Sequence, residues 1–365
     1  MIEELAGRIR SHGTAGQAVR PVGGGTKLAW GGPAGDAIDL ETSGLDQIVE
    51  HNVGDFTAIL QAGVRLADAQ AAFAAEGQML ALDPPLGVGD GATVGGMIAT
   101  GDSGPMRHRY GGVRDLVVGM SVVLSDGTIA KSGGKVIKNV AGYDLAKLFA
   151  GSYGTLGLIA SVSVRLHPMP DEHATAVGAS DDPQRLREAA AELARHPLEA
   201  DCLDVTWEDG AGRVLVRFGG AAAQHQAGET VERMRKLGLE DPGAQTDDAE
   251  LWTSVRGLQR SSDGIVVKVS GRPTDLPAVI RAAGDGTVVS RAALGLSWLA
   301  LPAGTDVAAV RDVLDPRPCV VLDGADAVAD AWPRPEEGTL AVMARLKERF
   351  DPARVFKPGS YVGGI

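Results

Sequence analysis

Cysteine and histidine are scarce in this sequence, and their scarcity argues against several kinds of metal and redox centre. Cys202 and Cys319 are its two cysteines, too few for an iron–sulfur cluster and too far apart for a CxxC motif. The 7 histidines are scattered, and none follows His225. Because a metal site needs clustered ligands, we predict no metal site and ordinary thiols.

Excess positive charge and long apolar runs are missing as well. A formal net charge of −12 argues against nucleic-acid binding, since the phosphate backbone demands a basic protein face. No run approaches the roughly 18 apolar residues of a spanning helix. The start, Met1-Ile2-Glu3-Glu4-Leu5, is acidic where a signal peptide needs basic charge. The sequence therefore predicts a cytoplasmic protein without a membrane span.

Glycine, by contrast, is abundant. The chain contains 50 glycines, roughly twice the usual frequency of about 7%, and most of the excess lies before Gly157. A GC-rich genome would favour glycine, but it would spread the residue more evenly. Glycine weakens helices and strands, so this density indicates a backbone that a ligand approaches closely.

The 365 residues exceed the size of a single hydrophobic core and predict two lobes. The first lobe, residues 1–168, is dominated by short strand-like runs, with an alanine-rich helix at 67–76 and a hairpin turn at Asp126-Gly127. The runs are 19–22, 37–40, 56–61, 117–124 and 159–166.

Two prolines at 168 and 170 end this lobe, and the composition then changes. Residues 171–330 alternate helices with strands and predict an antiparallel α+β lobe, for which a ferredoxin-like arrangement is one option. Its expected helices are 182–195, 226–236 and 305–313, and its expected strands are 202–207, 213–218, 265–270, 296–301 and 319–322. A last segment, 331–365, contains a helix at 337–349. No internal repeat is visible.

The first candidate site is the octapeptide Arg20-Pro21-Val22-Gly23-Gly24-Gly25-Thr26-Lys27, directly after a strand-like run. Successive glycines let backbone N–H groups point into one concavity, which suits a pyrophosphate. A glycine-rich surface turn is the alternative. The spacing is not that of a Walker loop.

Residues 87–92 fit G-x-G-x-x-A, but no strand precedes them and glycines interrupt any helix, so we reject a Rossmann fingerprint.

Two further segments carry paired glycines in apolar surroundings, where a missing side chain lets another body lie against the backbone. They are ATVGGMIATG at 92–101, followed by Arg109-Tyr110-Gly111 and Arg114-Asp115, and NVAGYDLAKLFAGSYGTLGLI at 139–159. Packing between loops is the alternative for each one. Arg109, Tyr110 and Arg114 suit ion pairing at a lobe interface as well as contact with a cofactor. His108, beside them, is the one histidine that we single out.

The order GGGT, ATVGGMIATG, RYGGVRD and GYDLAKLFAGSYGTLGLI resembles the FAD lobe of the vanillyl-alcohol-oxidase (PCMH-type) family. The ending, Phe350-Asp351-Pro352 to Lys357-Pro358-Gly359, is similar to the family's closing FDP…NPG. Within the family, the chain looks most like the E-type FAD-binding subunits of bacterial glycolate oxidase. The resemblance implies a two-lobed α+β PCMH-type FAD-binding domain, a reduced antiparallel cap lobe, and a C-terminal segment that returns to the FAD lobe.

The same resemblance implies the site residues. The pyrophosphate would be held by Pro21, Val22, Gly23, Gly24, Gly25, Thr26 and Lys27. The flavin cleft would be lined by Pro84, Thr93, Gly95, Gly96, Ala99 and Gly101. The adenosine half would lie against Gly154, Gly157 and Ile159. A side chain at Gly24 or Gly96 is expected to occupy space that the ligand needs.

Three residues depart from the family pattern. Thr26 stands where covalent members have histidine, so we predict non-covalent FAD. Gly101 replaces a common Asn, and Lys357 replaces the Asn before Pro-Gly. A cation at Lys357 near the isoalloxazine would favour the reduced anionic flavin, whereas a solvent-facing Lys357 would have no such effect.

The implied function is that of an FAD-bearing redox subunit in a glycolate (2-hydroxy acid) oxidising complex. Its implied partners are a D-like flavoprotein subunit and an iron–sulfur F-like subunit, through which the chain would lie peripheral to the inner membrane. A self-sufficient oxidoreductase for another small hydroxy acid or alcohol, and an assembly subunit with a structural flavin, are the alternatives. The metal-assisted relatives carry a late HxGDGNxH segment, which is absent here. Arg256, Arg260 and Lys268 are cations suited to a carboxylate, and the catalytic base stays unknown.

Overall fold

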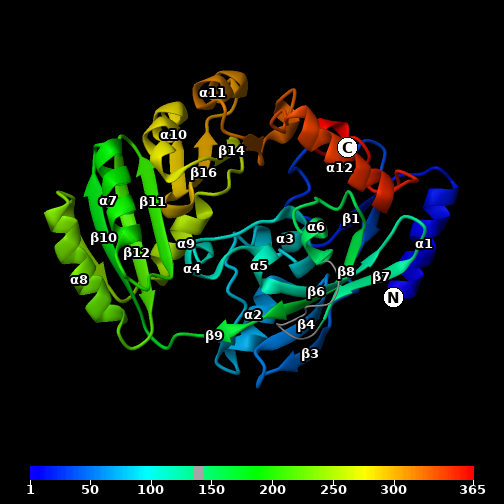
Figure 1. The fold of residues 1–365 in the computed structure, drawn as a ribbon, viewed down its shortest axis with the longest axis horizontal. Helices are drawn as coiled ribbons and strands as arrows, with labels where there is room; N and C mark the ends of the chain where they lie inside the picture. Colours follow the sequence, from blue (N-terminus) through cyan, green and yellow to red (C-terminus); the bar gives the residue numbers. More distant parts are fainter. Residues whose placement is uncertain (135–143) are drawn as a thin grey trace. The chain divides into compact units, whose positions relative to one another are not determined.

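The computed structural model describes residues 1–134 and 144–365, which divide into two compact units (Figure 1). Unit 1 comprises Met1–Ser103, Gly111–Met169 and Arg334–Ile365, and unit 2 comprises Gly104–Tyr110 and Pro170–Pro333. The C-terminal segment is thus part of the same unit as the N-terminal lobe. The contacts also place Gly104–Tyr110 in unit 2, although the sequence analysis assigns these residues to the first lobe.

Unit 1 is built around a five-stranded antiparallel sheet with the order β3-β4-β8-β6-β7. Its strands are β3 (Ile48–Asn52), β4 (Thr57–Gln61), β6 (Val117–Val123), β7 (Ile129–Gly133) and β8 (Leu158–Arg165). Two small sheets accompany it. The parallel pair is β1 (Val19–Val22) with β2 (Ile38–Glu41), and the antiparallel pair is β5 (Gln78–Met79) with β9 (His167–Pro168).

The helices of unit 1 are mostly short. They are α1 (Ile2–Thr14), α2 (Leu66–Ala74), α3 (Val94–Thr100), α5 (Val113–Leu116), α6 (Ala146–Phe149) and α12 (Glu337–Phe350). The predicted turn at Asp126-Gly127 joins β6 to β7: Gly127 has a φ of +79°, which favours glycine, and the Asp126 side chain accepts a hydrogen bond from the Thr128 N–H. The sequence analysis did not predict seven of these elements, namely β3, β5, β9, α1, α3, α5 and α6.

The C-terminal tail returns to the first strand of unit 1. Phe356 forms a parallel bridge with Val19 on β1, and the Lys357 N–H donates to the Val19 carbonyl at 3.0 Å. Phe356 is fully buried in one hydrophobic cluster with Ile9 of α1, Leu40 of β2 and Leu158 of β8. Apolar burial therefore holds the two ends of the chain on the same core.

Unit 2 contains an eight-stranded antiparallel sheet with the order β13-β10-β12-β11-β15-β16-β14-β17. Its strands are β10 (His173–Ser180), β11 (Cys202–Glu208), β12 (Ala211–Gly219), β13 (Glu240–Gln245), β14 (Ile265–Ser270), β15 (Thr287–Arg291), β16 (Leu296–Leu301) and β17 (Cys319–Val321). Its helices are α4 (Arg107–Tyr110), α7 (Pro183–Arg195), α8 (Ala223–Lys236), α9 (Ala249–Gly257), α10 (Leu276–Ala283) and α11 (Val307–Leu314).

The element order of unit 2 reveals a structural repeat that the sequence does not show. β10-α7-β11-β12-α8-β13 and β14-α10-β15-β16-α11-β17 each run strand, helix, strand, strand, helix, strand. Within each half the strands lie in the order fourth, first, third, second, which is the ferredoxin-like order. β11 and β15 join the halves. The repeat is one of topology, so it does not conflict with the absence of a visible repeat in the sequence.

Candidate cofactor site

The first glycine-rich motif forms the loop that leaves β1 in unit 1. Gly25 has a φ of +70°, a conformation that a side chain would strain. A Cβ at Gly24 would lie 1.6 Å from the Gly91 carbonyl oxygen, and one at Gly23 would lie 2.3 Å from Thr93 Oγ1. Glycine at 23 and 24 thus lets this loop pack against residues 91–93. Our expectation that a side chain at Gly24 would occupy space that the ligand needs is incomplete, because it would first displace protein backbone.

The second motif forms helix α3, and its two glycines have different neighbours. Thr93 caps the helix by accepting a hydrogen bond from the Gly96 N–H at 3.3 Å. A Cβ at Gly95 would lie 2.6 Å from the Ala62 Cβ, so Gly95 permits close packing on the segment after β4. A Cβ at Gly96 would meet Thr93 Oγ1 alone, at 3.2 Å. Gly96 therefore leaves space open beside the helix.

The Rossmann-like residues 87–92 do not open an α-helix. Val88–Asp90 form a short 3-10 turn in which Gly89 has a left-handed conformation. Arg65 donates a hydrogen bond to the Asp90 carbonyl at 3.2 Å and so ties this turn to the start of α2. The fingerprint requires a helix start within these residues, so its rejection stands. One ground for the rejection is wrong, because glycines do not prevent a helix here: α3 begins at Val94 and contains Gly95 and Gly96.

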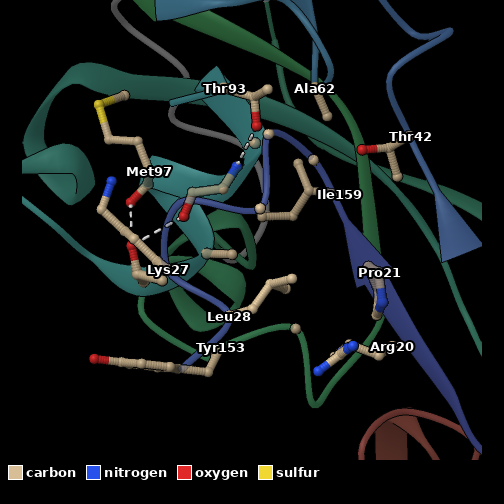
Figure 2. A pocket seen from close by; sticks show the side chains of 18 of the residues that line it. Arg20, Pro21, Lys27, Leu28, Thr42, Ala62, Thr93, Met97, Tyr153 and Ile159 are labelled. Carbon is tan, nitrogen blue, oxygen red and sulfur yellow. Dashed lines mark hydrogen bonds between the residues drawn. The ribbon is translucent and has the colours of Figure 1, made fainter. Parts of the chain in front are cut away.

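A cleft in unit 1 brings parts of all three motifs together (Figure 2). It encloses about 790 Å³ of empty space, a figure that includes its opening to solvent. The predicted site residues in its lining are Pro21, Gly23, Gly24, Gly25, Thr26, Lys27, Thr93, Gly95, Gly96, Ala99, Gly154, Gly157 and Ile159. Three others, Val22, Pro84 and Gly101, lie outside the lining.

The cleft also has lining residues that the sequence analysis did not assign to it. They are Arg20, Leu28, Thr42, Ala62, Met97, Thr100, Tyr153 and Lys357. Figure 2 shows Ala62, Thr42, Ile159 and Pro21 on one side of the view, and Met97 and Lys27 on the other. Ala62 and Thr42 lack any local signal, because they stand outside the glycine-rich motifs. Lys357 stood out in the sequence because it replaces the family's usual Asn. The sequence did not indicate whether its side chain faces the cofactor or solvent.

The third motif supplies the loop before β8, while its residues 139–143 lie outside the described part of the chain. The Gly151 and Tyr153 N–H groups donate to the carbonyls of Ile98 and Ala99 at 2.9 and 2.8 Å, which fastens the loop to α3. Gly154 follows with a φ of +75°. Burial raises the pKa of the Tyr153 phenol, so this lining residue stays protonated at neutral pH.

Among the described residues, three cationic side chains line the cleft, and two of them have carboxylate partners. Arg20 donates two hydrogen bonds to Asp39, at 2.7 and 2.9 Å, which lowers the pKa of that carboxyl. Lys27 Nζ lies 3.3 Å from Asp102 Oδ2, with both side chains buried. The third cation is Lys357, 8% exposed. Burial, and secondarily the charge of Arg20, lowers its pKa to about 8.

Arg109 and Tyr110 contact other residues of unit 2. Arg109 lies 3.4 Å from Asp201 and donates to the Glu199 carbonyl at 2.7 Å, while the Tyr110 hydroxyl donates to Asp201 at 3.3 Å. Burial, with the nearby Asp201 charge, raises the pKa of Tyr110 to about 12. Burial lowers the pKa of His108. Of the two roles weighed for Arg109 and Tyr110, these contacts favour ion pairing, and none of the three lines the cleft.

Comparison with known proteins identifies the cofactor that this chain binds. Residues 2–133 match the family model described as an FAD binding domain. The chain carries an FAD-binding domain. It is 42% identical to glycolate oxidase subunit GlcE of Escherichia coli over 123 residues, which are 34% of the chain and 35% of the relative. It is 35% identical to glycolate oxidase subunit GlcD of Bacillus subtilis over 190 residues, 52% of the chain and 39% of the relative. The chain thus spans little more than a third of these curated relatives.

The fold likeness is wider than the sequence likeness. A solved structure of alkyldihydroxyacetonephosphate synthase aligns with 98% of this chain and 75% of its own, with a TM-score of 0.71 and 15% identity. The expected α+β PCMH-type FAD-binding fold is therefore confirmed. No helix in residues 1–134 or 144–365 is both long and apolar enough to cross a membrane.

The lining of the cleft fits FAD. Gly96 leaves open the space that a side chain would take, and Leu28, Ala62 and Ile159 provide apolar surface for a ring. The glycine loop and Lys357 offer N–H donors for a diphosphate. Within the described ranges, no group of three His, Cys, Asp or Glu side chains is placed to hold a metal ion.

Proposed function

We propose that this chain is the FAD-binding redox subunit of a complex that oxidises glycolate or a similar 2-hydroxy acid. In this proposal a D-like flavoprotein subunit oxidises the substrate, and the FAD of this chain relays electrons toward an iron–sulfur F-like subunit. The bound FAD would supply the electron-accepting ring, while the chain binds and orients it. The likeness to the relatives named glycolate oxidase subunits GlcE and GlcD supports the substrate class.

The observation that carries the proposal is the chemistry of the cleft lining. Hydroxy-acid oxidation needs a base for the hydroxyl proton and an anchor for the carboxylate. The lining residues in the described part of the chain include no carboxylate and no imidazole, and Tyr153 is kept protonated by burial. Lys357, another lining residue with a shifted pKa, is the residue that we assign to the cofactor. Arg260, one cation suited to a carboxylate, is engaged with Asp323 at 2.8 Å. The cleft is therefore suited to cofactor binding more than to substrate chemistry.

We expect the isolated, flavin-loaded chain not to react with glycolate. Anaerobic mixing with glycolate should leave the absorbance of the oxidised flavin unchanged over minutes. Addition of a D-like subunit with glycolate should then bleach it. Rapid bleaching by glycolate alone would instead identify a self-sufficient oxidoreductase. A flavin that stays oxidised even beside a reduced D-like subunit would identify an assembly subunit with a structural flavin.

We also expect the FAD to be held without a covalent bond. Thr26 lies in the cleft lining at the place where covalent relatives have histidine, and a threonine hydroxyl is a poor nucleophile without an adjacent base. Precipitation with trichloroacetic acid should release all yellow colour into the supernatant. Colour that remains with the pellet through washing would show a covalent link.

A further inference from the structure

Lys357 is held in the cleft by the backbone of the C-terminal tail. Its N–H is bonded to Val19 on β1, and the neighbouring Phe356 is fully buried. Its φ of +43° lies in the left-handed region, which lysine rarely adopts. The surrounding contacts therefore impose this conformation, and they direct a long cationic side chain into the lining of a cofactor cleft.

The ammonium group of Lys357 has unused hydrogen-bonding capacity. It has three donors, but its one hydrogen bond to a described residue runs to the Tyr153 carbonyl at 3.5 Å, the long limit for such a bond. No carboxylate pairs with it among the described residues, in contrast to Arg20 and Lys27. A largely buried ammonium with so few partners is costly unless a ligand supplies acceptors.

Among the described residues, the charge that acts on Lys357 is positive. Arg20, on β1, is the charged residue that acts on it, and Asp39 neutralises Arg20 from β2. Tyr153 packs against Tyr361 of the tail, with ring centroids 5.6 Å apart, and burial raises the pKa of both phenols. Both phenols stay neutral below pH 9, so Lys357 is the group here that titrates near pH 8.

We propose that Lys357 binds the diphosphate of FAD and takes up a proton when the cofactor binds. The diphosphate is the part of FAD with formal negative charge at neutral pH, whereas both ring systems are uncharged. An ammonium that already faces Arg20 gains most from such an anion. This inference rests on FAD binding and is independent of the substrate and of electron relay.

The sign of the pH dependence follows from linkage. In the free protein Lys357 loses its proton near pH 8, and a bound diphosphate raises its pKa by stabilising the charged form. Below pH 8 the group is already charged, so the affinity for FAD changes little. Above pH 8 binding must add a proton, so the affinity falls by up to about tenfold for each pH unit.

The test compares three ligands on the FAD-free full-length chain by titration calorimetry at pH 7 and pH 9. The ligands are FAD, which is the whole cofactor, ADP, which contains its diphosphate, and riboflavin, which contains its flavin ring and no phosphate. Lys357→Asn removes the charge and suits a left-handed φ. We expect it to weaken FAD and ADP binding about 10- to 100-fold at pH 7, the range for one charged hydrogen bond, and to abolish the extra pH dependence. Riboflavin binding should not change.

Arg354→Asn is the matched control. Arg354 is an exposed cation on the same tail with a φ of +51°, and it does not line the cleft. The Arg354→Asn variant should bind all three ligands with affinities near those of the unaltered chain. Lys357→Arg keeps the positive charge, so it should retain most of the ADP affinity. A loss for riboflavin but not ADP would overturn the proposal in favour of a contact with the flavin ring. Equal losses in both Asn variants, or no loss in either, would overturn it as well.

Discussion

Replacing Gly96 with valine should abolish FAD binding while the chain stays folded. A Cβ at this position of α3 meets Thr93 Oγ1 at 3.2 Å and no other non-local atom within 4 Å, so the added methyl groups enter the open cleft. Valine is at least as favourable as glycine inside a helix, so the helix itself loses little. We expect FAD affinity to fall more than about 100-fold, or about 3 kcal/mol of binding free energy, measured by flavin absorbance and calorimetry.

Two other glycine substitutions separate loss of ligand space from loss of fold. Gly338 lies exposed in α12 with no atom near its would-be Cβ, so Gly338→Val should bind FAD normally. Gly95→Val would place its Cβ 2.6 Å from Ala62, so it should lower the thermal midpoint of the FAD-free protein. A Gly96→Val protein that retains stoichiometric FAD would refute the assignment of this space to the cofactor.

The sequence predicts the FAD fold well because the glycines that define it stand in local patterns. GGGT after a strand and paired glycines in an apolar run both mark close backbone approach, and most of the residues so marked line one cleft. The pattern does not say what approaches. Gly24 and Gly95 are required by protein backbone at 91 and 62, whereas Gly96 leaves open space. That distinction depends on long-range packing, which no local signal contains.

Other parts of the site could not be predicted for the same reason. Thr42 and Ala62 enter the lining because β2 and β4 lie beside the glycine loop and α3 in space, far from them in sequence. In unit 2 the repeated ferredoxin-like order escapes notice because the two halves share a topology and not a sequence pattern. Arg109 and Tyr110 were ambiguous until their partner Asp201 was known, since it lies about 90 residues away.

The second large effect is expected at Lys347, a buried lysine of α12 outside the cleft. Its ammonium group donates hydrogen bonds to the Thr155 and Phe356 carbonyls at 2.7 Å and to the Asp351 carboxylate at 2.6 Å. Asp351 in turn accepts bonds from the Val355 and Phe356 N–H groups at 2.8 and 2.9 Å. This pair therefore joins the C-terminal tail to the loop that carries Tyr153 and Gly154.

Lys347→Met should lower the free energy of unfolding by about 3–5 kcal/mol. Methionine fills a similar volume, but it leaves the Asp351 carboxylate buried without its cation and leaves two carbonyls without a donor. Burial lowers the pKa of Lys347, so burying its charge is itself costly. The loss of stability should therefore come from the Asp351 carboxylate and the two carbonyls that are left without their donor. Urea unfolding of the FAD-free chain, followed by circular dichroism, measures the change.

A double variant and a surface control test that explanation for Lys347. Asp351→Asn in the Lys347→Met background removes the unpaired charge, so it should recover part of the lost stability. Arg195→Met breaks the exposed pair of Arg195 with Glu192, whose side chains are 73% and 56% exposed, and should cost less than about 1 kcal/mol. If the double variant is less stable than Lys347→Met alone, the stability resides in the bonds that Asp351 makes to the tail. The Lys347 ammonium would then contribute little to holding loop and tail together.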